Sequence, residues 1–223
     1  MNTEKRKLIH SLVFPAFFLF LMWLVKIIEI IFNVDLVFLG IFPLKAEGLA
    51  GIIFSPFIHG SFSHLISNSF PLLILGTCLF YFYKKISYKV FFLIYILTGI
   101  WVWFGARGAW HIGASGIVYG LASFLFVSGM IRKNPHLMAI TFFVAFFYGS
   151  LIWGIFPDFF PFKNISWEGH LMGLISGVVL AIFYRKEGPQ RKLYSWDIED
   201  ENEDNDEDED EDEDAYWKTN TTQ

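Results

Sequence analysis

Six long apolar segments constrain the fold of this chain more than any other feature of its sequence. A helix that spans a bilayer needs about 20 mostly apolar residues, and 54% of the 223 residues here are hydrophobic. The segments are residues 11–32, 62–83, 88–105, 114–131, 136–156 and 168–184. They predict an all-α membrane protein, in which six transmembrane helices form a bundle.

The basic residues are distributed unevenly between the two ends of these segments. With six spans, twelve of them fall on one side of the membrane, at Lys5, Arg6, Lys7, Lys84, Lys85, Lys89, Arg132, Lys133, Arg185, Lys186, Arg191 and Lys192. The opposite loops contain only Lys45, Arg107 and Lys163. Because cytoplasmic loops carry an excess of Lys and Arg, the pattern predicts that both termini are cytoplasmic.

Composition divides the chain into three parts. Residues 1–10 form a basic cytoplasmic N-terminus, residues 11–186 form the six-span membrane domain, and residues 187–223 form a cytoplasmic tail. Of the 22 acidic residues, 15 lie between Asp197 and Asp214. Such a segment cannot bury a core, so we expect a disordered tail. A solvated extension is favoured over a tail that binds a partner or buffers cations.

The connection between the first two segments, residues 33–61, is long and moderately apolar. A connection of this length in a compact protein usually has a function or contains short helices of its own. Its apolar character predicts that it lies in the outer membrane interface. At the end of the first segment, Lys26 and Glu29 stand three residues apart and can pair on one helix face.

Four polar side chains fall at one depth near the outer surface. His64 and Asn68 stand four residues apart on the second segment, hence on one face of a helix. Ser115 begins the fourth segment, and His170 lies in the first turn of the sixth. All three segments begin on the outer side if the first runs outward. Because polar groups in a membrane are costly unless they face a bundle interior or a water-filled cavity, the pattern predicts a shared polar site.

Glycines on the fourth and sixth segments predict that these two helices touch. Rows of small residues let helix backbones approach closely, and the helix-contact candidates are Gly113, Gly116, Gly120, Gly169, Gly173 and Gly177. Such contact brings Ser115 within reach of His170. A serine hydroxyl bonded to an imidazole can lose its proton as it attacks a carbonyl, which is nucleophilic catalysis by serine.

The remaining parts of such a site are also present. The His64 imidazole, the Asn68 amide and the backbone N–H of Ser115 can donate hydrogen bonds to an oxyanion. Tyr119 lies one turn after Ser115, where its ring can pack on His170. Glu168 points to a different helix face from His170, so the hypothesis is a Ser-His dyad.

Each residue also has a structural interpretation when it is taken alone. A serine at a helix start is most often a cap, a histidine near a span end is often interfacial, and spaced glycines often serve packing alone. The coincidence of three segments at one depth favours an active site. A transporter could use the same depth for a proton or solute path, but no membrane-embedded acid or base continues that path beyond Tyr119. We interpret His59 and His111 as loop histidines.

Three motifs carry a resemblance to a known family. They are GASG at 113–116 with Tyr119, HGSFSHLISN at 59–68 and GHLMGLISG at 169–177. Together they resemble the rhomboid intramembrane serine proteases, over residues 12–184. The resemblance implies that Ser115 is the nucleophile and His170 the general base. It also implies that His64 and Asn68 donate to the oxyanion and that Tyr119 stacks on His170.

The resemblance implies an enzyme that cuts transmembrane or near-membrane segments of other proteins, usually at small residues, without a metal or cofactor. Its expected partners are transmembrane substrates and the lipid bilayer, with no nucleic acid. The residue usage, rich in Phe, Ile and Lys, favours a bacterial plasma membrane. Many members carry a Trp-Arg pair in the first long loop, where this chain has LKAEGLAGIIF. The alternative is a catalytically silent rhomboid-like protein that binds or escorts membrane clients, although silent members lose the serine or histidine that this chain keeps.

Overall fold

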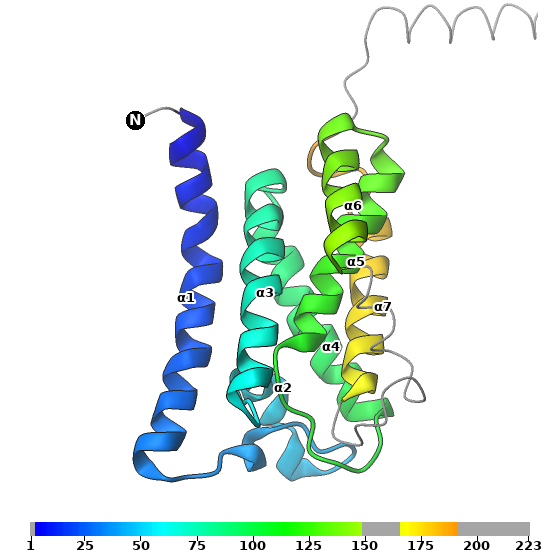
Figure 1. Cartoon of the computed structure of the whole chain (residues 1–223). Coiled ribbons are helices and arrows are strands. Elements are labelled where there is room, and N and C mark those ends of the chain that lie inside the picture. The colour runs from blue at the N-terminus through cyan, green and yellow to red at the C-terminus, as the bar shows by residue number, and fades with distance from the viewer. Residues whose placement is uncertain (1–2, 149–165, 191–223) are drawn as a thin grey trace, which may run out of the picture. The chain divides into compact units, whose positions relative to one another are not determined.

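The computed structural model describes residues 3–148 and 166–190. Within these residues, all the regular secondary structure is helical. The long helices are α1 (Thr3–Phe32), α3 (Phe62–Phe82), α4 (Ser87–Gly105), α5 (Ser115–Arg132), α6 (Pro135–Tyr148) and α7 (Trp167–Phe183). Short helices fill the first connection: η1 (Val37–Leu39), η2 (Ala46–Gly48), α2 (Gly51–Phe54) and η3 (Ser55–Phe57). Figure 1 shows the long helices side by side, with this connection at one end of the bundle.

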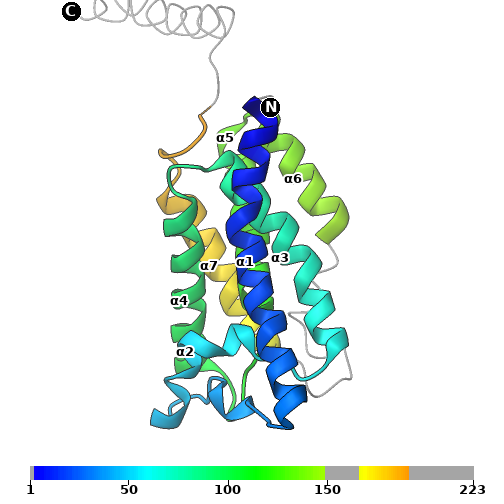
Figure 2. The same cartoon turned by 90° about the vertical axis from the view of Figure 1, so that its left-hand side faces the viewer.

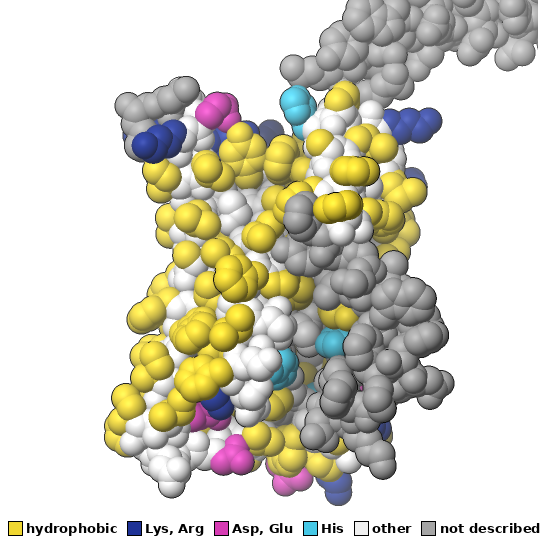
Figure 3. All heavy atoms as spheres, in the orientation of Figure 1, with side chains coloured by type: hydrophobic (Ala, Val, Ile, Leu, Met, Phe, Trp, Pro, Cys, Tyr) yellow, Lys and Arg dark blue, Asp and Glu magenta, His cyan; other side chains and the backbone are white. Residues whose placement is uncertain are grey.

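The outside of the bundle is suited to lipid. Helices α1, α3, α4 and α5 are long and apolar enough to cross a membrane, and α6 and α7 contain shorter apolar stretches, Pro135–Phe146 and Trp167–Phe183. Large apolar side chains point outward, among them Phe17, Phe142 and Phe183, and Figure 3 shows them over much of one face. A bundle of helices with apolar side chains on its outer faces is the arrangement that a multi-pass integral membrane protein requires.

Four of the six predicted spans therefore correspond to helices of spanning length. The end of the fifth, residues 149–156, lies outside the described residues, as does the tail from residue 191 onward. The first helix begins at Thr3, eight residues before the predicted apolar segment. Its first two turns contain the basic N-terminal residues. These turns extend beyond the apolar segment, which a helix can do where its side chains no longer need to contact lipid.

Helices α5 and α7 touch at backbone level. A Cβ atom at Gly173 would overlap the carbonyl oxygen of Gly116, and one at Gly177 would overlap that of Gly120. Helix α4 packs alongside both (Figures 1 and 2). There the Thr98 hydroxyl donates to the Ser176 hydroxyl at 3.3 Å, and both side chains are buried. The predicted contact between the two glycine-bearing helices is therefore present.

Helices α1 and α3 meet through large side chains. The ring of Phe14 lies 4.9 Å from that of Phe80 on α3, and also 4.9 Å from that of Phe91 on α4, measured between ring centroids. Pro15, inside α1, packs on Gly76 of α3. Near the far end, the Trp23 indole N–H donates to the Ser69 hydroxyl at 3.1 Å. Aromatic and proline side chains, not backbone, therefore hold the first helix.

The first connection is a compact layer of short helices, as its length predicted. Lys26 pairs with Glu29 at 3.1 Å, which confirms that prediction, and the Lys26 ammonium also donates to the carbonyl of His59 at 2.8 Å. The other Glu29 oxygen accepts the Leu36 N–H at 3.3 Å. A hydrogen bond from the Tyr95 hydroxyl to the Ile53 carbonyl attaches the layer to α4. The ion pair is structural, because it joins α1 to the connection.

The opposite end of the bundle carries the N-terminus and the last turns of α5 and α7 (Figure 1). Arg132, the last residue of α5, is buried, and its guanidinium donates to the carbonyls of Tyr184 at 2.7 Å and Arg185 at 2.8 Å. Its side chain satisfies carbonyls that the end of α7 leaves without intrahelical donors. This arginine, one of the twelve in the charge pattern, thus also fixes α7 against α5.

Candidate active site

Ser115 is the first residue of α5 and lies at the end of a turn that only glycine accommodates easily. Gly113 has a φ of +103°, a backbone conformation that L side chains rarely adopt. A Cβ atom there would lie 2.7 Å from Cε1 of His64. Gly113 thus precedes α5 and lies against α3, so the prediction that it belongs to the helix-contact glycines is wrong. Its place in a loop beside a histidine gives no periodic sequence signal.

His170 lies in the first turn of α7, where the glycine contact brings it to Ser115. The distance from its Nε2 to the Ser115 Oγ is 3.0 Å. The Tyr119 ring stacks on the imidazole, with ring centroids 4.2 Å apart and planes inclined by 7°. Gly116 sits directly beneath this contact, since a Cβ there would lie 3.0 Å from the carbonyl oxygen of Gly169. The helix contact and the stacked tyrosine together determine the position and angle of His170.

His64 and Asn68 face the same space from α3. The Ser61 hydroxyl caps this helix by accepting the His64 N–H at 3.1 Å. Asn68 is buried, and its Nδ2 donates one hydrogen to the His64 carbonyl at 3.0 Å. An amide nitrogen carries two hydrogens, so the second remains for another acceptor.

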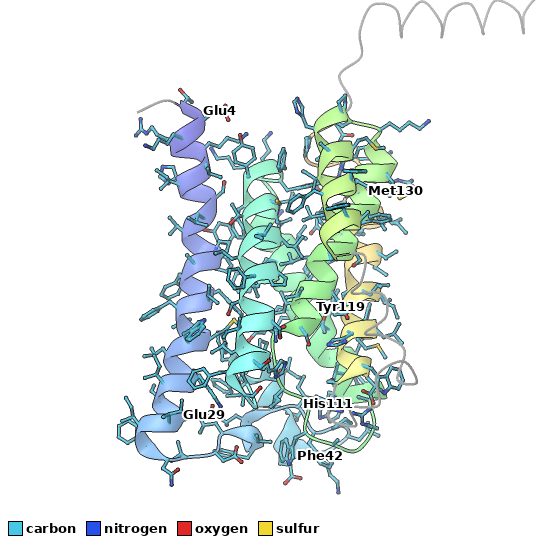
Figure 4. The ribbon with its side chains drawn as sticks, in the orientation of Figure 1. Glu4, Glu29, Phe42, His111, Tyr119 and Met130 are labelled. Carbon is cyan, nitrogen blue, oxygen red and sulfur yellow. The ribbon has the colours of Figure 1, made fainter. Side chains whose placement is uncertain are left out.

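A cavity of about 800 Å³ joins the two sides of the site. Residues of α3, α5, α7 and the connection before α5 line it, including His64, Asn68, Ser115, Tyr119 and His170. Figure 3 shows histidine side chains at the surface on the face between α3 and α5, and Figure 4 shows His111 at the loop end of the bundle, beyond Tyr119. All five lining residues that were predicted for one polar site thus share one cavity. Within the described ranges, no three His, Cys, Asp or Glu side chains are arranged to hold a metal ion.

His111 and Ser166 also line the cavity, and no sequence pattern predicts their pairing. His111 lies in a loop, as interpreted, but it is buried, and its Nδ1 lies 2.7 Å from the Ser166 Oγ. Its Nε2 lies 3.0 Å from the Arg107 carbonyl oxygen. Ser166 is the N-cap of α7 and accepts the Gly169 N–H at 3.3 Å. A cap serine can be predicted from sequence, but its histidine partner comes from a distant loop.

An ion pair between a buried carboxylate and an exposed guanidinium lies next to these residues. The Glu168 carboxylate is buried and lies 3.1 Å from the Arg107 guanidinium, and the same oxygen accepts the Arg107 N–H at 3.4 Å. Glu168 therefore attaches the first turn of α7 to the connection before α5. As the sequence indicated, its bonds go to Arg107 and not to His170.

His59 lies behind His64, with ring centroids 5.0 Å apart. It is 1% exposed, and its Nδ1 lies 3.3 Å from the Phe57 carbonyl oxygen. Burial lowers the pKa of His59 from 6.5 to about 4, with smaller contributions from the nearby His64 and Lys26. His59 therefore stays neutral at physiological pH and supports the oxyanion side of the cavity without adding charge.

Comparison with known proteins identifies the family of this chain. Residues 46–187 match the family model of the Rhomboid domain, which covers more than half of the chain. The chain belongs to the rhomboid family. Its relatives include uncharacterised proteins of Mycobacterium bovis, 36% identical over 78% of this chain and 75% of theirs, and of Mycobacterium leprae, 35% identical over 78% and 71%. A protein of Acanthamoeba polyphaga mimivirus that is named as a rhomboid protein is 28% identical over 57% of this rhomboid and 71% of its own length.

Proposed function

We propose that this rhomboid is an intramembrane serine endopeptidase, which hydrolyses peptide bonds in or near transmembrane segments of other proteins. The 3.0 Å distance between His170 Nε2 and Ser115 Oγ, inside a cavity that also holds hydrogen-bond donors, carries the proposal. A serine that only caps a helix needs no imidazole, and an interfacial histidine needs no stacked tyrosine. The family contains many intramembrane serine proteases, which supports the same reaction.

The first step transfers one proton and forms one bond. His170, neutral with its lone pair on Nε2, accepts the proton of the Ser115 hydroxyl while Oγ attacks the substrate carbonyl. The stack with Tyr119 limits rotation of the imidazole about its axis. Glu168 does not serve as the orienting carboxylate of a triad, since it is engaged by Arg107.

The attack leaves a negative charge on the carbonyl oxygen, and α3 and α5 supply its donors. The unused hydrogen of Asn68 Nδ2, the His64 imidazole and the Ser115 N–H are the candidates. The Ser115 amide belongs to the first turn of α5, where N–H groups have no intrahelical acceptor. Donors fixed in a site of low polarity stabilise an oxyanion strongly because they need little reorganisation.

The intermediate collapses when the imidazolium of His170 gives its proton to the leaving amine, which produces an acyl-enzyme at Ser115. Water from the cavity then attacks the ester, and His170 again accepts and returns the proton. Substrates with small, weakly helical residues near the outer membrane surface suit this site, because a hydrogen-bonded helix must unwind to expose a carbonyl.

The same proposal includes the arrangement in the membrane. Six spans, with α6 and α7 completing the bundle, leave both termini in the cytoplasm and open the cavity to the outer side. The 17 residues of α7 are at the lower limit of about 17 for a spanning helix. Lys and Arg are concentrated at the end of the bundle that carries the N-terminus, which supports this orientation. The mycobacterial relatives support a bacterial plasma membrane. Residues 187–190 still pack on the bundle, where the Gln190 carbonyl accepts a hydrogen bond from the Asn134 amide at 2.8 Å, so the proposed cytoplasmic tail begins at residue 191 and not at residue 187.

Cleavage of a single-span reporter in liposomes tests the proposal. The reporter carries Ala-Gly residues near its outer end, and the wild type is compared with Ser115→Ala and His170→Ala. Ser123→Ala serves as the control, since it removes a serine from α5 away from the dyad. We expect product from the wild type and the control only, and fluorophosphonate labelling of Ser115.

Product from the Ser115→Ala variant would contradict the proposed nucleophile. A folded wild type that neither cleaves the reporter nor reacts with the probe would contradict the enzyme itself. That result would instead favour a rhomboid-like protein that binds membrane clients without cutting them.

A further inference from the structure

We propose that His111 and Ser166 are positioning residues for the general base, through a hydrogen bond that fixes the first turn of α7 against the loop leading to Ser115. The proposal rests on the proposed function, because it concerns the placement of His170. Neither residue touches the reacting atoms. They act by holding His170 in position relative to Ser115.

The partners of His111 determine where its proton lies. The Arg107 carbonyl can only accept a hydrogen bond, so His111 Nε2, at 3.0 Å, carries the hydrogen. In the neutral ring, Nδ1 is then a lone pair, and the Ser166 hydroxyl donates to it at 2.7 Å. The same hydroxyl accepts the Gly169 N–H at 3.3 Å. Each group in this chain of three hydrogen bonds has one consistent role.

The His111–Ser166 bond joins the same two segments as the dyad, at an earlier position on each of them. His111 precedes Ser115 by four residues, and Ser166 precedes His170 by four, so each contact joins residues 55 positions apart. The backbone links the two contacts directly, since the His170 N–H donates to the Ser166 carbonyl at 3.3 Å. A shift of the Ser166 end therefore moves His170 relative to Ser115.

His111 is a firm attachment for this bond. It is 4% exposed. Its backbone N–H donates to the Ile41 carbonyl at 2.8 Å, and its carbonyl accepts the Ile41 N–H at 2.9 Å. These bonds fasten the histidine to the layer of short helices, which connects to α1 through Lys26. The first turn of α7 is thus held to a fixed part of the molecule.

Two different restraints therefore bracket the dyad. On the deeper side, the backbones of α5 and α7 touch at Gly116 and Gly173. On the loop side, side chains make the contact, His111 with Ser166 and Arg107 with Glu168. Without the His111–Ser166 bond, α7 remains packed at its glycines, and its first turn is joined to the loop by the Glu168–Arg107 pair, whose arginine side chain is 42% exposed. The first turn then has more freedom to move. A displacement of about 1 Å at a reacting group can cost about 100-fold in rate.

The test is a double-mutant cycle with Ser166→Ala and His111→Phe, measured as kcat and KM for the liposome reporter. Phenylalanine is chosen because the site is buried and an aromatic ring is kept without its hydrogen-bonding nitrogens. We expect each single variant to lower kcat by about 10- to 100-fold, with KM changed less than about twofold. The double variant should be no slower than the slower single variant, because both remove the same bond. Ser166→Thr, which retains a capping hydroxyl, should restore most of kcat.

Ser123→Ala is the matched control. Its hydroxyl also joins α5 to α7, by donating to the Leu174 carbonyl at 2.8 Å, but deeper in the bundle. We expect it to lower the unfolding temperature about as much as Ser166→Ala while leaving kcat near the wild-type value. Equal kcat losses in Ser123→Ala and Ser166→Ala would overturn the proposal in favour of general helix packing.

The remaining outcomes are also decisive. A wild-type kcat in Ser166→Ala, or losses that multiply in the double variant, would overturn the positioning role while leaving the protease function intact. A wild type that neither cleaves nor labels would overturn the proposed function, and the positioning role with it.

Discussion

The two helix contacts that hold α5 and α1 in the bundle are built from opposite kinds of residue. Helix α5 meets α7 through glycines, so that backbone touches backbone. Helix α1 meets α3 through Phe14 and Pro15, whose side chains fill the space between the two backbones. The distance between α5 and α7 is therefore fixed by backbone atoms, which cannot change rotamer. The distance between α1 and α3 is set by side chains, which can adjust.

This difference matches the placement of the site. A dyad needs its two side chains held to a few tenths of an ångström, and a backbone contact gives little room for adjustment. The α1–α3 contact is remote from the dyad and needs only to be filled. If precision is confined to the glycine contact, substitutions there should impair catalysis far more than substitutions in the α1–α3 contact.

The largest effect is expected for Gly173→Ala. The added methyl group would overlap the backbone carbonyl of Gly116, which cannot rotate away. We expect α7 to shift and the kcat/KM of the reporter to fall by more than about 100-fold, as displaced catalytic groups do, together with a lower unfolding temperature.

Gly105→Ala is the control for that variant. Its methyl group would lie 3.4 Å from the flexible end of Met172, an ordinary contact. We expect nearly wild-type activity and stability from it. If Gly173→Ala retained activity as well, the claim that backbone contact sets the dyad would fail.

Asn68→Ala examines the open side of the site, where α3 faces α5 across the cavity. Loss of one oxyanion donor typically lowers kcat by about 100- to 1,000-fold, and we expect the lower end with KM little changed. Ser67→Ala is matched to it, since Ser67 also donates to the His64 carbonyl, at 2.9 Å, without a second hydrogen to offer. Similar losses in the two variants would assign the effect to the support of His64 and not to the oxyanion.

Much of the fold could be predicted because membrane helices are recorded in local composition. The segment predicted at 62–83 is the helix Phe62–Phe82, and the one at 114–131 is Ser115–Arg132. The glycine spacing also predicted the approach of Ser115 to His170, since both rows follow the helical period. These features repeat along one helix and so leave a pattern in the sequence.

The parts that escaped prediction depend on loops. The left-handed conformation of Gly113 and the pairing of His111 with Ser166 arise where the chain leaves one helix and approaches another. No period connects such residues, and each looks like an isolated turn glycine, loop histidine or helix cap. Gly113 was therefore grouped with the helix contacts, although the atoms nearest to it belong to α3.

A pH effect on stability is expected from His59, at the end of the α1–α3 contact. Its pKa is about 4 in the folded protein and 6.5 as the ordinary value. Between these values the unfolded chain binds a proton that the folded chain does not, so stability is complete above pH 6.5 and falls as the pH drops to 4. The loss is at most about 3 kcal/mol, at 1.36 kcal/mol per pKa unit.

Thermal unfolding in detergent from pH 7.5 to pH 4 measures this effect against His59→Leu. The variant should be less stable at pH 7.5, because it loses the bond to the Phe57 carbonyl, but its stability should decline less on acidification. Equal declines in the two proteins would show that His59 is not the group whose burial makes the fold sensitive to acid.

The smallest effect is expected for Phe14→Leu, in the aromatic contact itself. Phe14 is partly buried, and its ring lies near Phe80, Phe91 and Tyr88. Loss of the aromatic pairs costs about 1 kcal/mol beyond the lost area, and neighbouring rings can move to fill part of the space. We expect a slightly lower unfolding temperature and a kcat/KM within about twofold of wild type, because α1 does not touch the dyad and side-chain contacts absorb small changes. A tenfold loss of activity at unchanged stability would mean that α1 also helps to set the dyad geometry, and the contrast between a precise and a tolerant contact would then be wrong.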